Sequence, residues 1–280
     1  MNRAVSAAVA LAREHGLDPE RPVVIGDRQV VLVHLAPAPV LARVGVEDVF
    51  GPRLDWQRGA VSFVRYLADG GAPVVPPSEL LPPGPFEVEG MVVSFWRFVE
   101  DRQELPLDPR VAGEGLRRIH ELGLAYDGEL AAFWPPSEAE ALIERAALTD
   151  DERELLRRTI DRIALPERPQ QPLHGDAHIW NCVRAPDGPL WIDFDEPCRG
   201  PLEWDAATMI ESSLVSFGPF EQVDQAYEAA FGDRFTRDEL APFVELRVVL
   251  IAEWLGCHLP RYPAAREELD RILAWLRALE

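Results

Sequence analysis

Three oxygen-bearing side chains in the middle of this 280-residue chain have a spacing that could do chemistry. Asp176 and Asn181 lie five positions apart, and Asp193 follows after a turn signal, Ala185-Pro186-Asp187-Gly188-Pro189. Because this turn separates two short apolar runs, it predicts a hairpin that returns Asp193 to the side of Asn181. Phosphoryl transfer needs a carboxylate that orients the acceptor hydroxyl and oxygen ligands that hold Mg²⁺ against the nucleotide phosphates. Asp176 suits the first task, and Asn181 with Asp193 suits the second.

The order of these residues is also informative. An Asp, four further residues, an Asn and a later Asp before an aromatic residue is the order of the protein-kinase motifs. In this chain Gly175 stands where those motifs have an Arg, and Asp195 stands where they end in Gly. The segments 174–181, 192–195 and 203–205 together resemble the aminoglycoside phosphotransferase and choline kinase-like family, whose members have a protein-kinase-like fold.

This resemblance implies an α+β protein with two lobes. The N-terminal nucleotide-binding lobe would be small, contain an antiparallel sheet and span residues 1–96. The C-terminal lobe, residues 97–280, would be larger and mainly helical, and would carry catalysis and acceptor binding. The implied activity is that of a small-molecule kinase, which uses ATP or GTP with Mg²⁺ to phosphorylate an alcohol group.

The resemblance also implies roles for individual residues. Asp176 corresponds to the catalytic base, and Asn181 and Asp193 correspond to the metal ligands. Asp205 corresponds to a residue that braces the catalytic loop through hydrogen bonds, and His174 is expected to brace the same loop.

Nucleotide contacts are expected in the N-terminal part of the chain. In kinase-like folds a cation on the third strand touches the α- and β-phosphates, and Arg43 lies at the matching place. The alternative for Arg43 is an exposed position on a strand face. The junction between the lobes is expected just after the strand at 91–96, where apolar side chains flank the nucleobase. Phe95, Trp96 and Phe98 are candidates for this role, and burial in the core is the alternative for each.

The chain departs from the family pattern in two ways. The first hairpin contains Gly26 but no Gly-rich loop. The helix expected at 54–68 has Ala60 where a Glu would pair with the strand cation, and the remaining acidic candidates are Asp55 and Glu47. These departures keep a second interpretation open, a pseudokinase that binds nucleotide without turnover.

A third interpretation is a metal-dependent hydrolase. His174, His178, Asp193 and Asp195 could bind Zn²⁺ or Mn²⁺ if both imidazoles pointed toward the carboxylates. In the kinase interpretation His178 is instead a neighbour of the site, and Asp195 contacts a second ion or faces the acceptor. Metal preference separates the two, because the kinase needs Mg²⁺ together with a nucleotide.

The composition excludes several kinds of chemistry. The formal net charge is −20, and all 28 basic residues are Arg. Without Lys, neither a Walker A phosphate-binding loop nor a Lys Schiff base can form. The acidic balance disfavours nucleic acid as a partner and is compatible with a cationic acceptor. Glu211, Glu245 and Glu253 are expected on solvated helix faces, with binding to such an acceptor as the alternative.

Cysteine usage and hydropathy indicate a reduced, soluble protein. Cys182, Cys198 and Cys257 form no paired motif, which argues against a disulfide framework or a zinc ribbon. No signal peptide or run of 18 apolar residues occurs, so we expect a cytoplasmic protein without a membrane partner. The sequence does not determine the oligomeric state.

Residue patterns predict the elements that must position these side chains. They indicate helices at 5–15, 54–68, 111–122, 203–215, 220–231, 237–255 and 264–279, and strands at 23–25, 29–35, 40–44, 86–88 and 91–96.

Overall fold

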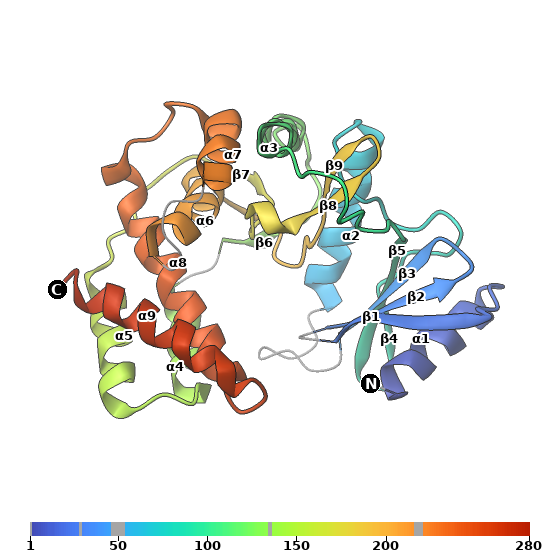
Figure 1. The fold of residues 1–280 in the computed structure, drawn as a ribbon, viewed down its shortest axis with the longest axis horizontal. Helices are drawn as coiled ribbons and strands as arrows, with labels where there is room; N and C mark the ends of the chain where they lie inside the picture. Colours follow the sequence, from blue (N-terminus) through green and yellow to red (C-terminus); the bar gives the residue numbers. More distant parts are fainter. Residues whose placement is uncertain (1, 28–29, 46–53, 134–135, 216–220) are drawn as a thin grey trace. The chain divides into compact units, whose positions relative to one another are not determined.

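A computed structural model describes residues 2–27, 30–45, 54–133, 136–215 and 221–280 (Figure 1). These residues divide into two compact units. The first unit contains Met1–Asp108, Arg118–Ala131 and Trp180–Pro197, and the second contains Pro109–Arg117, Ala132–Ile179 and Cys198–Glu280. The boundary near residue 96 stays a prediction.

An antiparallel sheet of five strands forms the body of the first unit (Figure 1). The strand order is β1-β2-β3-β5-β4. The strands are β1 (Arg21–Asp27), β2 (Val30–Ala36), β3 (Val40–Gly45), β4 (Phe86–Val88) and β5 (Met91–Arg97). All of the strands predicted from the sequence are present. The turn between β4 and β5 is Glu89-Gly90, and both residues have positive φ angles, as a tight hairpin turn of primed type requires.

Helix α1 (Asn2–Glu14) covers one face of this sheet. Its apolar residues recur at helical spacing, so Ala4, Ala8 and Leu11 all reach the core that contains Phe95. Side chains alternate along a strand, so Ser94 points to the opposite face. There it contacts helix α2 (Leu54–Asp69), and the Ser94 hydroxyl donates to the Gln57 side-chain oxygen (3.5 Å).

The predicted hairpin after Asn181 is confirmed. Strand β8 (Cys182–Ala185) pairs with β9 (Gly188–Trp191), and Cys182 lies opposite Trp191. The wholly buried Trp191 donates its amide to the Pro73 carbonyl oxygen (2.8 Å) and accepts at its own carbonyl from the Val75 amide (3.0 Å). The hairpin is therefore a part of the first unit, together with the five-stranded sheet.

The second unit is mainly helical. Its helices are α4 (Pro136–Arg145), α5 (Asp150–Arg162), α6 (Leu202–Val215), α7 (Glu221–Phe231), α8 (Arg237–His258) and α9 (Arg266–Arg277), and α3 (Pro109–Gly123) begins in it. A small sheet has the order β6-β10-β7, with bounds Ala131–Ala132, Cys198–Pro201 and Gln170–Leu173. Helix α8 packs against α4, α5, α6 and α9, so it is the central helix of this unit (Figure 1).

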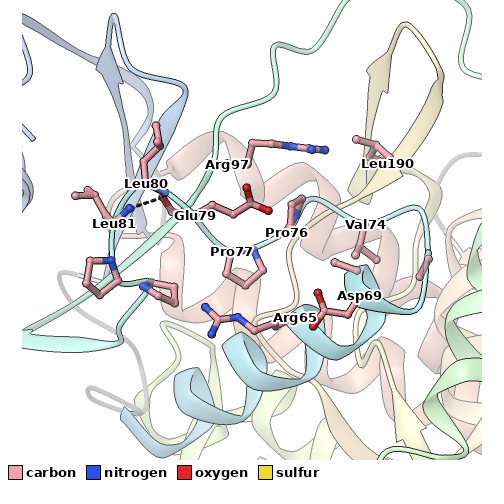
Figure 2. Close-up of a pocket in the computed structure, with 15 residues that line it drawn as sticks. Arg65, Asp69, Val74, Pro76, Pro77, Glu79, Leu80, Leu81, Arg97 and Leu190 are labelled. Atoms are coloured by element: carbon pink, nitrogen blue, oxygen red, sulfur yellow. Dashed lines mark hydrogen bonds between the residues drawn. The ribbon is translucent and has the colours of Figure 1, made fainter.

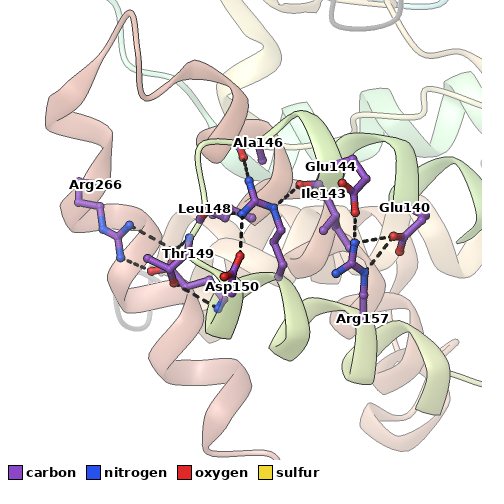
Figure 3. A network of polar contacts seen from close by, with 11 residues as sticks. Glu140, Ile143, Glu144, Ala146, Leu148, Thr149, Asp150, Arg157 and Arg266 are labelled. Carbon is purple, nitrogen blue, oxygen red and sulfur yellow. Dashed lines mark hydrogen bonds and ion pairs between the residues drawn. The ribbon is translucent and has the colours of Figure 1, made fainter.

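Arginine side chains form ion pairs between the outer helices of this unit (Figure 3). Arg157 of α5 pairs with Glu140 and Glu144 of α4. Arg266 of α9 pairs with Glu152, which also closes a capping box with Thr149 at the start of α5. The structure confirms the predicted α+β class, and no described helix combines the length and apolar character needed to cross a membrane.

Candidate functional site

Two consecutive residues of α6 form hydrogen bonds with the backbone of the loop that follows β7. Asp205, which is wholly buried, accepts the His174 amide at Oδ2 (2.9 Å) and the Gly175 amide at Oδ1 (2.9 Å). Trp204 donates its indole N–H to the Gly175 carbonyl oxygen (2.8 Å). Gly175 has a φ of 90°, a conformation that glycine adopts without steric cost. These contacts fix the backbone immediately before Asp176.

Both carboxylate oxygens of Asp176 have a cationic or imidazole neighbour. Arg247 of α8 pairs with Oδ1, and His178 Nε2 lies 3.3 Å from Oδ2. Burial raises the pKa of Asp176, but the guanidinium of Arg247 and the neighbouring imidazoles of His178 and His174 lower it by more, so the pKa lies well below its usual range. Asp176 is therefore ionised at neutral pH.

His174 lies inside this loop and is wholly buried. Its Nδ1 accepts the backbone amide of Asp176 (3.3 Å), so the imidazole carries its proton on Nε2. The hydrolase interpretation needs several imidazoles and carboxylates around one ion. Within the described ranges, no three His, Cys, Asp or Glu residues are grouped so that they could hold a metal ion, which gives that interpretation no support.

Asn181 and Asp193 lie on neighbouring segments of the first unit. The Ile192 amide, next to Asp193, donates to the Asn181 backbone carbonyl oxygen (2.9 Å). Asn181 is buried, whereas Asp193 is exposed and has a φ of 63°, the left-handed region. Few non-glycine residues adopt that region, and those that do often lie at functional sites. An amide oxygen and a carboxylate are hard donors of the kind that Mg²⁺ binds, so these residues fit a magnesium ion.

The two residues after Asp193 have separate partners in the first unit. Phe194 is buried, and its ring meets the ring of Phe63 on α2 edge-on (6.2 Å between centroids, 76° between planes). Asp195 pairs with Arg43 of β3. Sequence reasoning did not find this partner for Asp195.

Arg43 lies on the sheet face opposite the α1 core, in register with Ser94. Only 13% of its side chain is exposed, so the exposed strand position considered from the sequence is wrong. Helix α2 provides no acid for it in the described part of the chain. Ala60 is wholly buried, Asp55 is paired with Arg58 (3.0 Å), and Glu47 lies outside the described residues.

Comparison with known families agrees with this arrangement. Residues 55–243, more than half of the chain, match the model of the phosphotransferase enzyme family. The chain belongs to the phosphotransferase enzyme family. Among curated protein sequences, none is significantly similar to this phosphotransferase chain.

Several solved structures with a similar fold are named as small-molecule kinases. A choline/ethanolamine kinase family protein from Mesorhizobium loti has a TM-score of 0.65 at 15% identity, over 99% of this phosphotransferase and 94% of that chain. Amicoumacin kinase, solved with AMP-PNP and Ca²⁺, has a TM-score of 0.67 at 13% identity, over 99% of this phosphotransferase and 96% of that chain. A putative fructosamine-3-kinase from Thermobifida fusca has a TM-score of 0.60 at 21% identity, over 98% of this phosphotransferase and 99% of that chain. These likenesses confirm the protein-kinase-like two-lobe fold.

The aromatic residues proposed at the lobe junction differ in their surroundings. Phe95 is wholly buried in the core of the phosphotransferase's sheet, as the core alternative describes. Trp96 is also buried, and its indole N–H donates to the Ser94 hydroxyl (2.9 Å). Phe98 is half-buried and stacks on His34 (3.6 Å between centroids, 11° between planes). Phe98 is therefore the candidate with most surface left for a nucleobase, and that role stays a prediction.

A cavity of about 840 Å³ lies elsewhere in the first unit of the phosphotransferase (Figure 2). It lies between the last turns of α2, the proline-rich segment 76–83 and Leu190 of β9. Charged side chains of both signs surround it, including Arg65, Arg97 and Glu79. None of the candidate site residues lines this cavity.

Two of the three acids expected on solvated helix faces are buried in the phosphotransferase. Glu211 of α6 and Glu253 of α8 face the packed interior, because both helices are enclosed by neighbours, and burial raises the pKa of each. The pKa of Glu253 reaches about 9, and neither of its carboxylate oxygens has a hydrogen-bond partner in the described part of the chain. Glu245 is partly exposed and pairs with Arg162 (3.0 Å).

Proposed function

We propose that this chain transfers the γ-phosphoryl group of ATP or GTP to a hydroxyl group of a small molecule. The observation that carries the proposal is the bracing of the Asp176 loop. Two backbone amides immediately before this carboxylate are fixed by Asp205, and Asn181 follows five positions later. A rigidly placed carboxylate is what phosphoryl transfer requires, because the reaction depends mostly on positioning and on charge stabilisation.

Asp176 acts as the base in this mechanism. Its carboxylate accepts a hydrogen bond from the acceptor hydroxyl and directs the oxygen at the γ-phosphorus. As the new oxygen–phosphorus bond forms, the bond from the γ-phosphorus to the bridging oxygen breaks and the nucleoside diphosphate leaves. The hydroxyl proton goes to Asp176. Since the pKa of Asp176 lies below its usual range, this proton transfer comes late, when the attacking oxygen is already acidic.

Asn181 and Asp193 would provide oxygen ligands for Mg²⁺. The bound ion would neutralise charge on the phosphates as the diphosphate leaves. Arg43 contacts the phosphates from β3, and Asp195 holds its guanidinium in place. An Arg can bind two phosphate oxygens at once, unlike the Lys that usually occupies this position. Phe98 flanks the nucleobase.

The pseudokinase alternative rested on two departures from the family pattern. One is the absence of a Gly-rich loop, and the other is the missing acid at Ala60, which left the orientation of Arg43 unexplained. The pairing of Arg43 with Asp195 supplies the missing carboxylate from another part of the chain. The enzyme would act in the cytoplasm, where ATP and GTP are available, on a small-molecule acceptor.

A nucleotide-consumption assay with Mg²⁺ tests the proposal. The purified chain is supplied with ATP or GTP and a panel of hydroxyl compounds, and diphosphate release is measured. Asp176→Asn should lower turnover by about 1,000-fold while nucleotide affinity changes by less than about threefold, because the base acts in the chemical step. Asp187→Asn, in the exposed turn between β8 and β9, is the matched control. Equal turnover in wild type and Asp176→Asn, or no nucleotide binding at all, would refute the proposal.

A further inference from the structure

The cavity of about 840 Å³ in the first unit has the size and the lining of a small-molecule site (Figure 2). Pockets of this volume enclose drug-sized molecules. Buried apolar residues such as Val74 and Leu81 form part of the walls, and exposed charged side chains form another part. An apolar lining with a few polar groups is typical of pockets that bind small molecules, and the proposed phosphoryl transfer makes no use of this one.

Backbone hydrogen bonds hold the proline-rich wall of this cavity from two strands. The Val75 amide donates to the Trp191 carbonyl oxygen of β9 (3.0 Å), and the Arg97 amide of β5 donates to the Pro76 carbonyl oxygen (3.0 Å). Four proline rings in the segment 76–83 restrict its backbone further. The cavity is therefore preformed, which lowers the cost of ordering the protein when a ligand binds.

Four charged side chains line the cavity, and the rest of the described chain does not pair with them. They are Arg65 and Asp69 of α2, Glu79 of the proline-rich segment, and Arg97 at the end of β5. None of the four forms a side-chain hydrogen bond or an ion pair with another described residue. All four are exposed, so water solvates them in the free protein. A ligand with matching charges can replace this water without breaking an existing ion pair.

Arg97 and Asp69 lie toward the same end of the cavity, the end that Val74 and Leu190 line (Figure 2). The chain path accounts for this arrangement. Asp69 is the last residue of α2, and five positions later Val74 forms a bridge with Trp191, the residue after Leu190. Arg97 reaches the same end from β5. One cation and one acid from different elements therefore line this end together, and they are not paired with each other.

A ligand with a single charge fits this end poorly. An anion attracted by Arg97 would be repelled by Asp69, and for a cation the reverse holds. Because the two partners belong to different elements, a molecule with opposite charges at its two ends matches them best. We propose that the cavity binds a short zwitterionic peptide, with its ammonium group on Asp69, its carboxylate on Arg97 and apolar side chains against Val74 and Leu190. This site is independent of the proposed kinase activity.

Leucyl-leucine and its capped forms test this proposal on the full chain. N-acetyl-leucyl-leucine lacks the ammonium group, leucyl-leucinamide lacks the carboxylate, and N-acetyl-leucyl-leucinamide lacks both. Glycylglycine keeps the two charges without apolar side chains, and leucine carries both charges on one carbon. A titration followed by ligand-observed NMR gives the Kd of each compound for the wild-type chain.

We expect leucyl-leucine to bind with a Kd of about 1 mM or tighter. Each cap should weaken binding by at least about threefold, because an exposed ion pair contributes at most about fivefold in affinity. Glycylglycine and leucine should also bind at least about threefold more weakly than leucyl-leucine, since the first lacks the apolar contacts and the second cannot reach both charged partners.

Variants of the two charged residues test where the peptide binds. Arg97→Met should weaken leucyl-leucine by at least about threefold and leave leucyl-leucinamide unchanged, because the amide has no carboxylate to lose. Asp69→Asn should likewise weaken leucyl-leucine and leave N-acetyl-leucyl-leucine unchanged. A general loss of structure would weaken every compound, so the selectivity is the readout. Arg237→Met and Asp187→Asn, which change exposed charges outside the cavity, should bind all compounds as the wild type does.

Several outcomes would overturn the proposal. They are the absence of leucyl-leucine binding to the wild-type chain up to about 10 mM, equal affinities for leucyl-leucine and any capped form, and binding of leucine or glycylglycine as tight as that of leucyl-leucine. Wild-type selectivity in either Arg97→Met or Asp69→Asn would overturn it as well. Asp176→Asn should bind leucyl-leucine with wild-type affinity, because Asp176 does not line the cavity, and a tenfold loss in that variant would place the peptide elsewhere.

Discussion

Arg43 of β3 pairs with Asp195, a residue two positions beyond the candidate metal ligand Asp193. In kinase-like folds a cation at this strand position is expected to pair with an acid on the following helix, and here that helix presents the buried Ala60. The cation that would hold the phosphates and the segment that would hold the metal ion are therefore linked directly. Nucleotide affinity and metal affinity should respond together to changes at either residue.

A double-mutant cycle tests this link. Arg43→Met and Asp195→Asn should each weaken binding of a fluorescent ATP analogue with Mg²⁺ by about tenfold, equivalent to about 1.4 kcal/mol. Because the two residues act as a pair, their effects on the binding free energy should not add. The loss in the double variant should be smaller than the sum of the two single losses by at least about 0.5 kcal/mol. Arg65→Met, an exposed arginine on α2, serves as the control. Strictly additive losses would show that the pair is not a functional unit.

The bracing of the Asp176 loop gives a prediction about stability. Asp205→Asn replaces one of the two carboxylate oxygens that accept the His174 and Gly175 amides. Since a hydrogen bond to a buried charge contributes about 1.5–3 kcal/mol, the free energy of unfolding should fall by about 2 kcal/mol. Urea denaturation measures this loss, and Asp187→Asn should show none. An unchanged urea midpoint for Asp205→Asn would mean that the loop does not depend on these bonds.

Glu253 predicts a pH dependence of stability. Burial raises its pKa from 4.5 to about 9, and the nearby charge of Glu140 adds to the effect. Between these values the unfolded chain loses the proton while the folded chain keeps it. The contribution of Glu253 is therefore fully present below about pH 4.5 and falls by up to about 1.4 kcal/mol per pH unit as the pH rises toward 9.

Unfolding at several pH values isolates this group. Glu253→Gln, which cannot ionise, should become more stable relative to wild type at pH 8 than at pH 5, as measured by urea denaturation. Glu245→Gln removes a carboxylate from the same helix that is partly exposed and paired with Arg162. Its stability difference from wild type should stay nearly constant over this range. A constant difference for Glu253→Gln as well would mean that Glu253 is ionised in the folded state.

Close packing between α3 and α7 gives a prediction that is independent of function. A Cβ atom added at Gly113 would lie 2.1 Å from the Ala226 carbonyl oxygen, so the helices would have to separate. Gly113→Ala should lower the free energy of unfolding by about 1–3 kcal/mol despite the better helix propensity of Ala. At Gly45 the nearest atom is 3.7 Å away, so Gly45→Ala should change the melting temperature little. Equal melting temperatures for the two variants would contradict the predicted clash.

Local signals in the sequence predicted most of the elements and the hairpin of the candidate site. The turn at Asp187-Gly188 is a local signal, and so is the helical spacing of Ala4, Ala8 and Leu11. Arg247 and the partner of Arg43 could not be predicted in this way. Their contacts span 71 and 152 positions, and nothing in the local pattern distinguishes Arg247 from the other arginines of the chain.

The burial of charged residues also could not be predicted from the sequence. The spacing of Glu253 resembles that of an ordinary surface acid, and only the packing of α8 among four other helices places it inside. Sequence patterns describe one helix at a time, whereas burial on all sides depends on how many neighbours the fold assembles around it.

The left-handed backbone at Asp193 affects how mutations at this position should be interpreted. Besides glycine, only Asp and Asn adopt this conformation readily, so an alanine would add main-chain strain to the loss of the carboxylate. Asparagine removes the charge alone and is the cleaner probe. A descendant of this protein that abandoned catalysis would accordingly retain Asn or Gly here, and its chain path would look unaltered although its chemistry had been lost.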